Sequence, residues 1–278
     1  MTIDLTKNTD LAGIRIPDSK LAREITELVW DSESPLLFHH SSRVYYWGAL
    51  AGRRRGLKFD TELLYAGAMF HDMGLTHQHS SQGERFEVDG ANVARDFLRG
   101  RCISQHDIDT VWTAIALHTT PGIPQHMHPV VALLTAGVEM DVLGLAYSEY
   151  SDAERNSVVG AHPRTAHFKE DIIQAFYDGI KHKPETTFGN VKADVFADKD
   201  SALHPRQFLQ RHPGIRLARV SPLTCGEIQR ALKLLSARTG RLDLAACDLI
   251  QQHSRGTDHV YQETHHEPLY ERNRVAGR

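Results

Sequence analysis

The 278-residue chain has few cysteines, little net charge and no long apolar run. Its three cysteines, Cys102, Cys225 and Cys247, lie far apart and form no CxxC pair, which indicates a reducing compartment and no sulfur ligands. The start, MTIDLTKNTD, lacks the apolar segment of a signal peptide. No run approaches the roughly 18 apolar residues that a membrane span requires. We therefore expect a cytoplasmic protein without a membrane partner.

The chain also lacks a large excess of positive or negative charge. The net charge is −3, with 24% charged residues, so no electrostatic surface for nucleic acid is expected. The arginine run at 53–55 is interpreted as the end of a helix, where cations meet free carbonyl groups. An apolar content of 41% is sufficient for a substantial core. A globular protein with a small-molecule partner is the resulting expectation.

Alternation with period two is nearly absent, so few strands are expected and the fold class is all-α. Helical spacing predicts helices at roughly 18–30, 38–53, 60–73, 90–99, 105–118, 128–143 and 165–181. After Asp198 a stretch with three prolines and no clear period indicates a linker. We predict a helical-bundle domain at 16–200 and a helical C-terminal extension with a polar tail at 205–278, whose role the sequence does not indicate.

Four polar residues occupy positions where burial is expected. His71 and Asp72 end the apolar segment TELLYAGAMFHDM, and a helix that is apolar all round is normally buried. Asp141 continues the apolar stripe of PVVALLTAGVEMDVLG at helical spacing, and His40 does the same in LLFHHSSRVYYWGALAG, whereas Arg43 falls on another face. A buried carboxylate needs a partner charge or a metal. The four residues together therefore predict one metal site.

A structural role remains the alternative for each histidine alone, because a core imidazole commonly bonds a backbone carbonyl. His118 shows the same ambiguity. It shares a face with Val111, Ala114 and Ile115 on a helix that Ser104 is expected to cap.

His40, the pair His71-Asp72, and Asp141 resemble the H…HD…D pattern of the HD-domain superfamily, all-helical metal-dependent enzymes that are mostly phosphohydrolases. The chain further resembles the cyanamide hydratase-like branch in the segments HSSRVYYWGAL, LLYAGAMFHDMGL, RFEVDGANVARDFL, AIALHTTPGIP and GIKHKPETTFGNVKADV. The resemblance covers about residues 16–198. It implies an HD-domain helical bundle with His40, His71, Asp72 and Asp141 as metal ligands. Several members of the branch form dimers, so it also implies a homo-oligomer.

Two imidazoles and two carboxylates suit Zn²⁺, Fe²⁺, Mn²⁺ or Co²⁺. The resemblance favours zinc. A divalent ion lowers the pKa of its bound water toward about 7 and supplies hydroxide as the nucleophile.

Candidates for the remaining roles lie near these ligands. Asp72 is expected to orient the water. His118 and Glu87 are the candidate proton donors, although a packing role for His118 and a helix N-terminal role for Glu87 remain open. A second metal ion bound through His118 also remains open. Arg85, Thr119 and His126 are the candidate substrate contacts.

Three functions remain in view. The first is a metal-dependent hydratase or hydrolase that adds hydroxide to cyanamide or another small nitrile, giving urea or an amide. The second is an HD-type phosphohydrolase acting on a nucleotide or phosphoester; the stretch 70–81 offers no Arg or Lys for it, although Arg43 and Arg85 are nearby candidates. The third is a non-catalytic binding module, against which the four intact ligands argue.

Overall fold

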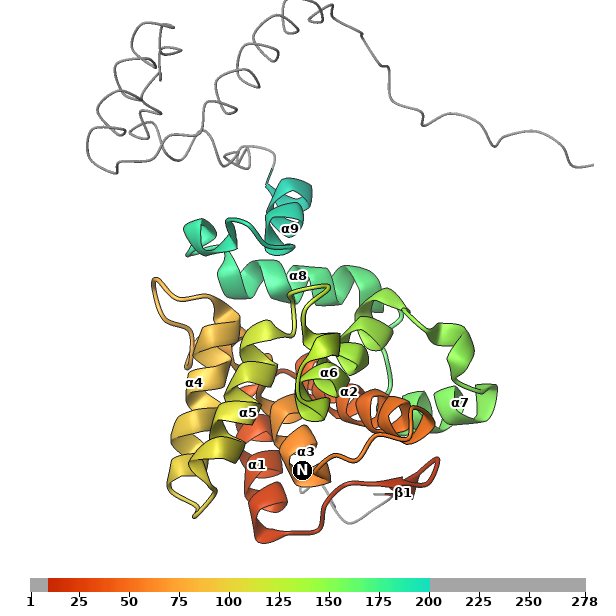
Figure 1. Ribbon diagram of the computed structural model, residues 1–278. Helices are drawn as coiled ribbons and strands as arrows, with labels where there is room; N and C mark the ends of the chain where they lie inside the picture. Colours follow the sequence, from red (N-terminus) through yellow and green to blue (C-terminus); the bar gives the residue numbers. More distant parts are fainter. Residues whose placement is uncertain (1–9, 201–278) are drawn as a thin grey trace, which may run out of the picture. The chain divides into compact units, whose positions relative to one another are not determined.

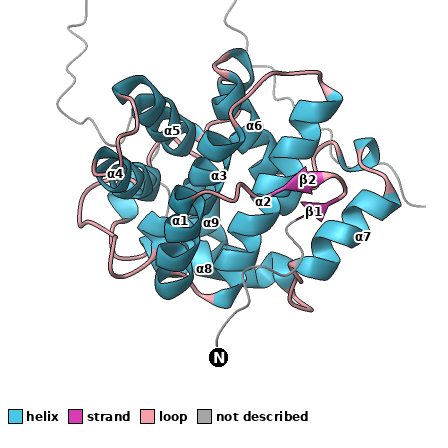
Figure 2. Cartoon of the chain, turned by 90° about the horizontal axis from the view of Figure 1, so that it is seen from below, coloured by secondary structure: helices cyan, strands magenta, loops and turns pink. Residues whose placement is uncertain are grey.

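The computed structural model describes residues 10–200. Over this range the chain is almost entirely helical, and its strands form one short hairpin (Figures 1 and 2). The all-α prediction is therefore confirmed. The predicted extension at 205–278 lies outside the described residues, and the division of the chain into two parts stays a prediction.

The elements follow in chain order. Strands β1 (Asp10–Leu11) and β2 (Ile14–Arg15) pair antiparallel. The helices are α1 (Lys20–Ser32), α2 (Pro35–Arg54), α3 (Thr61–Phe70), α4 (Phe86–Arg99), α5 (Gln105–Leu117), α6 (Pro129–Val138), α7 (Asp152–Ala161), α8 (Phe168–Ile180) and α9 (Lys192–Lys199). Short helical turns are η1 (Met73–Leu75), η2 (Pro124–His126), η3 (Glu139–Leu143), η4 (Tyr147–Glu149) and η5 (Pro184–Thr187).

Short polar side chains begin the helices that carry the site. Ser34 caps α2 by accepting from the Leu37 amide, and a proline occupies the first turn. Asp60 caps α3 by accepting from two amides, and Ser104 caps α5 as the sequence predicts. Each cap satisfies a backbone donor that has no partner inside its helix. The first turn of each helix is thus fixed by its own sequence.

Helix α3 lies in the middle of the bundle and contacts α1, α2, α4, α5 and α6. Eight of its ten residues are buried, from Leu63 to Phe70, in agreement with its apolar character on every face. The end of α3 is therefore enclosed by the surrounding helices.

Helices α2 and α6 cross at two glycines. A Cβ atom at Gly48 would lie 2.6 Å from the Leu133 carbonyl oxygen, and one at Gly137 would lie 2.3 Å from the Val44 carbonyl oxygen. Neither position has room for a side chain, so the absence of Cβ at both allows the two backbones to approach. This approach brings the residues that follow α6 close to those of α2.

Helices α8 and α9 form the end of the described chain, on the side where α3 ends (Figure 1). Helix α8 contacts η1 and α2. A second apolar cluster, separate from the main core, joins them to the bundle; its buried members are Leu37, Leu75, Phe86, Ile172, Ile180 and Phe196. The segment from α8 to α9 thus covers the helix ends that carry the His-Asp pair.

Several boundaries differ from the predicted ones. Helix α4 begins at Phe86, so that Glu87 lies inside it, although the sequence predicts a start near residue 90. Helix α6 ends at Val138, and the chain continues as the wider π-helical turn η3. The hairpin, α7 and α9 are not among the predicted elements. Among residues 10–200, no helix has both the length and the apolar character needed to traverse a bilayer.

Candidate metal centre

The His-Asp pair lies where α3 ends. His71 is the C-terminal cap with helical dihedral angles, whereas Asp72 has φ −100° and ψ 4° and has left the helix. This change of direction lets the two neighbouring side chains face the same point. Both residues are fully buried.

Three ligand atoms meet at this point. The Nε2 atoms of His40 and His71 are 3.2 Å apart. Asp72 Oδ2 is 3.3 Å from His71 Nε2 and 3.6 Å from His40 Nε2. Among the described residues these three form the group whose ligand atoms all lie within 4.8 Å of one another. Tetrahedral ligands at the usual zinc bond lengths are about 3.3 Å apart, which these spacings match.

Each of the two imidazoles is held through its other nitrogen. His71 Nδ1 donates to the Ala68 carbonyl oxygen at 2.7 Å, and His40 Nδ1 donates to Asp141 Oδ2 at 2.7 Å. The protons are thereby placed on Nδ1, and both Nε2 atoms carry lone pairs. Two lone pairs 3.2 Å apart repel each other unless a cation lies between them. The pKa of His71 is also lowered, mainly by burial, so its neutral form is favoured.

The Asp72 carboxylate has no hydrogen-bond partner on either oxygen, although both are buried. An ionised carboxylate in this position is costly unless a cation neutralises it. The negative charge of Asp72 also acts on a second carboxyl group, that of Glu33. Burial, and then the charge of Asp72, raise the pKa of Glu33 well above its usual range. Glu33 is buried at the end of α1 and accepts from Ser41 Oγ at 3.2 Å. The donor set and the unpartnered carboxylate thus fit a divalent ion.

The structure does not bring Asp141 into the group of three. Its carboxylate lies on the Nδ1 side of His40, and Arg43 binds it with two hydrogen bonds of 2.9 Å. Trp47 Nε1 donates to Oδ1 at 2.9 Å and Arg164 Nη2 at 2.8 Å. Burial raises the pKa of Asp141, but His40 and Arg43 outweigh burial and hold that pKa well below its usual range. Asp141 is therefore an ionised carboxylate that already has several donors.

Arg43 corrects one expectation. The sequence places it on a face of α2 away from His40, but its side chain is fully buried and its remaining donors bind the carbonyl oxygens of His162 and Pro163. The guanidinium also lies 4.7 Å from the Phe168 ring centre. A long side chain can reach a neighbouring face of the helix. The spacing of residues along the helix does not show this.

His118 ends α5 beside the group of three. Its Nδ1 donates to the Ile115 carbonyl oxygen at 2.6 Å, and its Nε2 lies 3.8 Å from Asp72 Oδ1. Burial is the main cause that lowers the pKa of His118 to about 3. Its Nε2 is thus an unprotonated acceptor near Asp72 Oδ1, and its ring lies 4.9 Å from the His71 ring, measured between ring centres.

Glu87 forms a buried ion pair with Lys192. It accepts hydrogen bonds from Lys192 Nζ and Thr119 Oγ1. Burial raises the pKa of Glu87, but Lys192 and then His118 more than offset this, so that the pKa is lowered. The predicted catalytic residue is thus ionised and already paired. A second buried ion pair, Lys183 with Asp89 at 2.6 Å, also joins α4 to the segment that follows α8.

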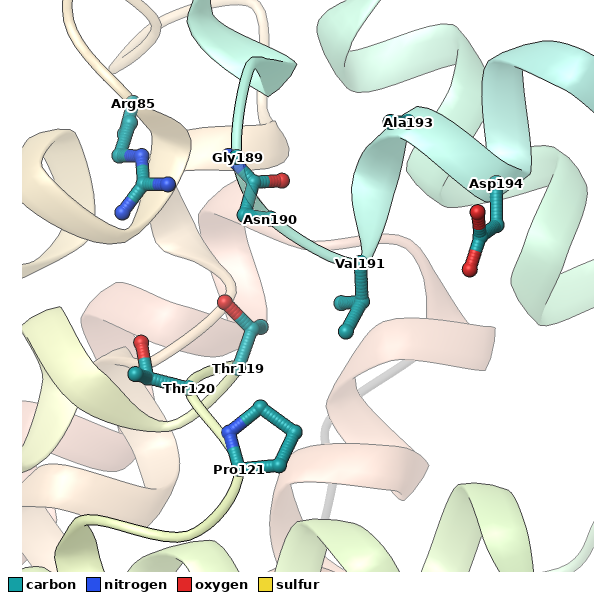
Figure 3. A pocket seen from close by; sticks show the side chains of 9 residues that line it. All are labelled: Arg85, Thr119, Thr120, Pro121, Gly189, Asn190, Val191, Ala193 and Asp194. Atoms are coloured by element: carbon teal, nitrogen blue, oxygen red, sulfur yellow. The ribbon is translucent and has the colours of Figure 1, made fainter. Parts of the chain in front are cut away.

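A cavity of about 530 Å³ opens beside this ion pair (Figure 3). Of the three predicted substrate contacts, Arg85 and Thr119 line it, together with Asn190 from the segment before α9. Thr119 follows His118 directly in the sequence, but none of the three ligand residues lines the cavity. His126, the third predicted contact, is exposed in η2 and is not part of the lining.

The family comparison agrees with this geometry. Residues 37–154 match the family model described as HD domain, and His40, His71, Asp72, His118 and Asp141 all lie within the match. This segment is therefore similar to an HD domain. No curated protein matches the chain. The HD-domain superfamily is thus supported, and HD domains bind divalent metals.

Three residues that contact the site residues are not among those predicted from the sequence. Trp47 lies in the core, and its indole N–H also donates to Asp141 Oδ1. Glu33 falls at a helix end and carries no motif. Lys192 comes from α9, beyond the family match, and nothing in its local sequence distinguishes it from a surface lysine. Only the tertiary packing reveals these three.

Proposed function

We propose that this chain is a metal-dependent hydratase or hydrolase whose ion is held by His40, His71 and Asp72. One observation carries the proposal. Two imidazole lone pairs and an unpartnered carboxylate oxygen, all buried, lie at spacings that suit ligands of one ion. Among the candidate metals, Zn²⁺ suits these spacings best, since octahedral ligands at similar bond lengths would be about 3.0 Å apart.

A divalent ion at this position supplies Lewis acidity and a water molecule that loses a proton near neutral pH. Asp72 Oδ1 has no hydrogen-bond partner in the described structure and would be available to accept a hydrogen bond from such a water. His118 Nε2, an acceptor 3.8 Å from Asp72 Oδ1, is placed to take the proton.

Addition of water to a small nitrile uses these groups without any further reactant. The water oxygen forms a bond to the nitrile carbon, one water proton goes to His118, and the nitrile nitrogen then takes that proton. With cyanamide the product is urea after a proton moves from oxygen to nitrogen.

Closure of the site supports a small substrate. His40, His71 and Asp72 are fully buried, and His118 is nearly so. Arg43 and Arg164 lie nearby, but both are engaged by Asp141 and do not offer free donors to a phosphate. A small neutral molecule such as cyanamide therefore fits the metal centre better than a nucleotide.

The phosphohydrolase remains the second candidate, because one observation favours it. The described structure shows no hydrogen-bond or ion-pair partner for the Arg85 guanidinium at the cavity, which Thr119, the residue after His118, also lines. A phosphoester bound there would find a cation for one of its oxygens.

The test measures metal content and turnover in the full chain. Wild type is expected to carry zinc or another divalent ion and to release urea from cyanamide, and His71→Ala is expected to lose both. His106→Ala, which removes an exposed histidine far from the HD pair in sequence, serves as the matched control and should retain both. Turnover of nucleoside monophosphates in place of cyanamide would favour the second candidate. Wild type without bound metal and without turnover would contradict the proposal.

A further inference from the structure

The resemblance to HD domains implies Asp141 as a metal ligand, but the contacts of its carboxylate give it another role. One carboxylate oxygen, Oδ2, accepts from His40 Nδ1 and Arg43 Nη2. The other oxygen, Oδ1, accepts from Arg43 Nε, Trp47 and Arg164. Coordination by Asp141 would require these buried donors to lose their partner, which is costly.

The direction of the His40 ring supports the same conclusion. Its Nδ1 faces Asp141, and its Nε2 faces His71 and Asp72. The two nitrogens of an imidazole point to opposite sides of the ring. A single ion within bonding distance of Nε2 cannot also be within bonding distance of a carboxylate that is hydrogen-bonded to Nδ1.

We infer that the metal centre of this chain has three protein ligands and that Asp141 is a positioning residue, which fixes the ring and the tautomer of His40. A carboxylate behind a ligand histidine orients the ring and makes it a stronger donor to the metal. Arg43, Trp47 and Arg164 in turn hold the carboxylate in place. Three protein ligands leave a position for water, as catalytic zinc sites require. This inference rests on the proposed metal site.

The experiment titrates Zn²⁺ into the metal-free full chain and records the visible absorption of the Co²⁺ form. Asp141→Asn is expected to keep one equivalent of metal, with affinity lowered about 10–100-fold. Its Co²⁺ bands should keep their positions, because the ligands are unchanged. Asp72→Asn, which removes a ligand, is expected to lose high-affinity binding and to change the bands.

Arg164→Met provides the matched control. It removes one donor to Asp141 from a side chain that is 31% exposed and leaves the carboxylate and its bond to His40 in place. A smaller loss of metal affinity than in Asp141→Asn is expected. A merely structural role of the cluster would instead give Arg164→Met and Asp141→Asn similar effects, and this result would overturn the inference.

A structure of the zinc-loaded wild type tests the same point without any variant, should Asp141→Asn fail to fold. We expect the Asp141 oxygens to remain on Nδ1 of His40. An Asp141 oxygen within about 2.2 Å of zinc would overturn the inference. Wild type that binds no Zn²⁺ would contradict the proposed function itself, so the two failures are distinguishable.

Discussion

Each imidazole at the metal centre is bound through Nδ1 to a different acceptor. His71 and His118 use the carbonyl oxygens of Ala68 and Ile115, each three residues earlier in its own helix, whereas His40 uses Asp141. The backbone acceptors are present whenever the helix is formed. The carboxylate depends on tertiary packing and is ionised. His40 is therefore the ligand whose donor strength the protein can change by substitution.

The state of His118 leads to a pH dependence of stability in the metal-free protein. Its pKa is about 3 in the folded chain, against an ordinary value of 6.5, because burial disfavours the charged form. The unfolded chain therefore binds more protons between these values, and stability falls as pH decreases from 6.5 toward 3. We expect His118→Gln to reduce this slope by up to about 1.4 kcal/mol per pH unit.

Urea unfolding of metal-free protein at several pH values between 4 and about 7 measures this slope. An identical slope in His118→Gln and wild type would contradict the assignment of His118 as a buried neutral imidazole.

The sequence predicted individual residues where a polar side chain interrupts an apolar stripe. His40, His71, Asp72, His118 and Asp141 are all buried as this pattern requires. The pattern did not distinguish a ligand from a residue that positions a ligand. That distinction depends on which imidazole nitrogen faces the carboxylate and on a guanidinium from a neighbouring helix face, and neither is encoded in spacing along one helix.

At the scale of elements, most of the site lies at helix ends, whereas His40 lies inside α2. His71 caps α3, His118 caps α5, and Asp141 lies in the π-helical turn after α6. Side chains at helix ends are free of the fixed angular spacing inside a helix, so groups from three helices can converge. The wider turn η3 is a common feature of functional sites.

Helix α9 is joined to helix α4 by the buried ion pair of Lys192 with Glu87, and this leads to a prediction for stability. Lys192→Met leaves Glu87 buried without its cation, and a loss of about 3–5 kcal/mol in the free energy of unfolding is expected. Replacing both partners, as in Lys192→Met with Glu87→Gln, should recover much of this loss. Chemical denaturation followed by circular dichroism measures both variants.

Lys181→Met is the control, because Lys181 pairs with Asp178 at the surface. Its free energy of unfolding should stay near the wild-type value. Equal stabilities of Lys192→Met and Lys181→Met would show that the buried pair does not hold α9.

The long apolar helices could be predicted from their periodicity, whereas the short peripheral elements could not. The predicted segments 38–53, 60–73 and 105–118 end within three residues of α2, α3 and α5 on both sides. By contrast, α7 buries only Val158 among its residues. A helix with so little buried surface leaves no periodic apolar signal, and its start is fixed by the capping box of Ser151 and Glu154.

At the scale of the whole molecule, the metal centre should couple to global stability. Zinc at 100 times its dissociation constant is expected to stabilise the fold by about 2.7 kcal/mol. For a chain of this size the midpoint of thermal unfolding should rise by roughly 5–10 °C. Differential scanning calorimetry with and without a chelator measures the change, and His71→Ala should show none. A wild-type midpoint that does not respond to zinc would contradict the site.

The crossing of α2 and α6 has a consequence for how variants of this chain are interpreted. Asp141 reaches His40 and Arg43 because Gly48 and Gly137 allow two backbones to touch. A single added methyl group at either glycine would move the carboxylate away from the imidazole while every donor atom of the site remained in the sequence. Inspection of ligands alone would therefore classify such a variant as intact, although the spacing that aligns them had been lost.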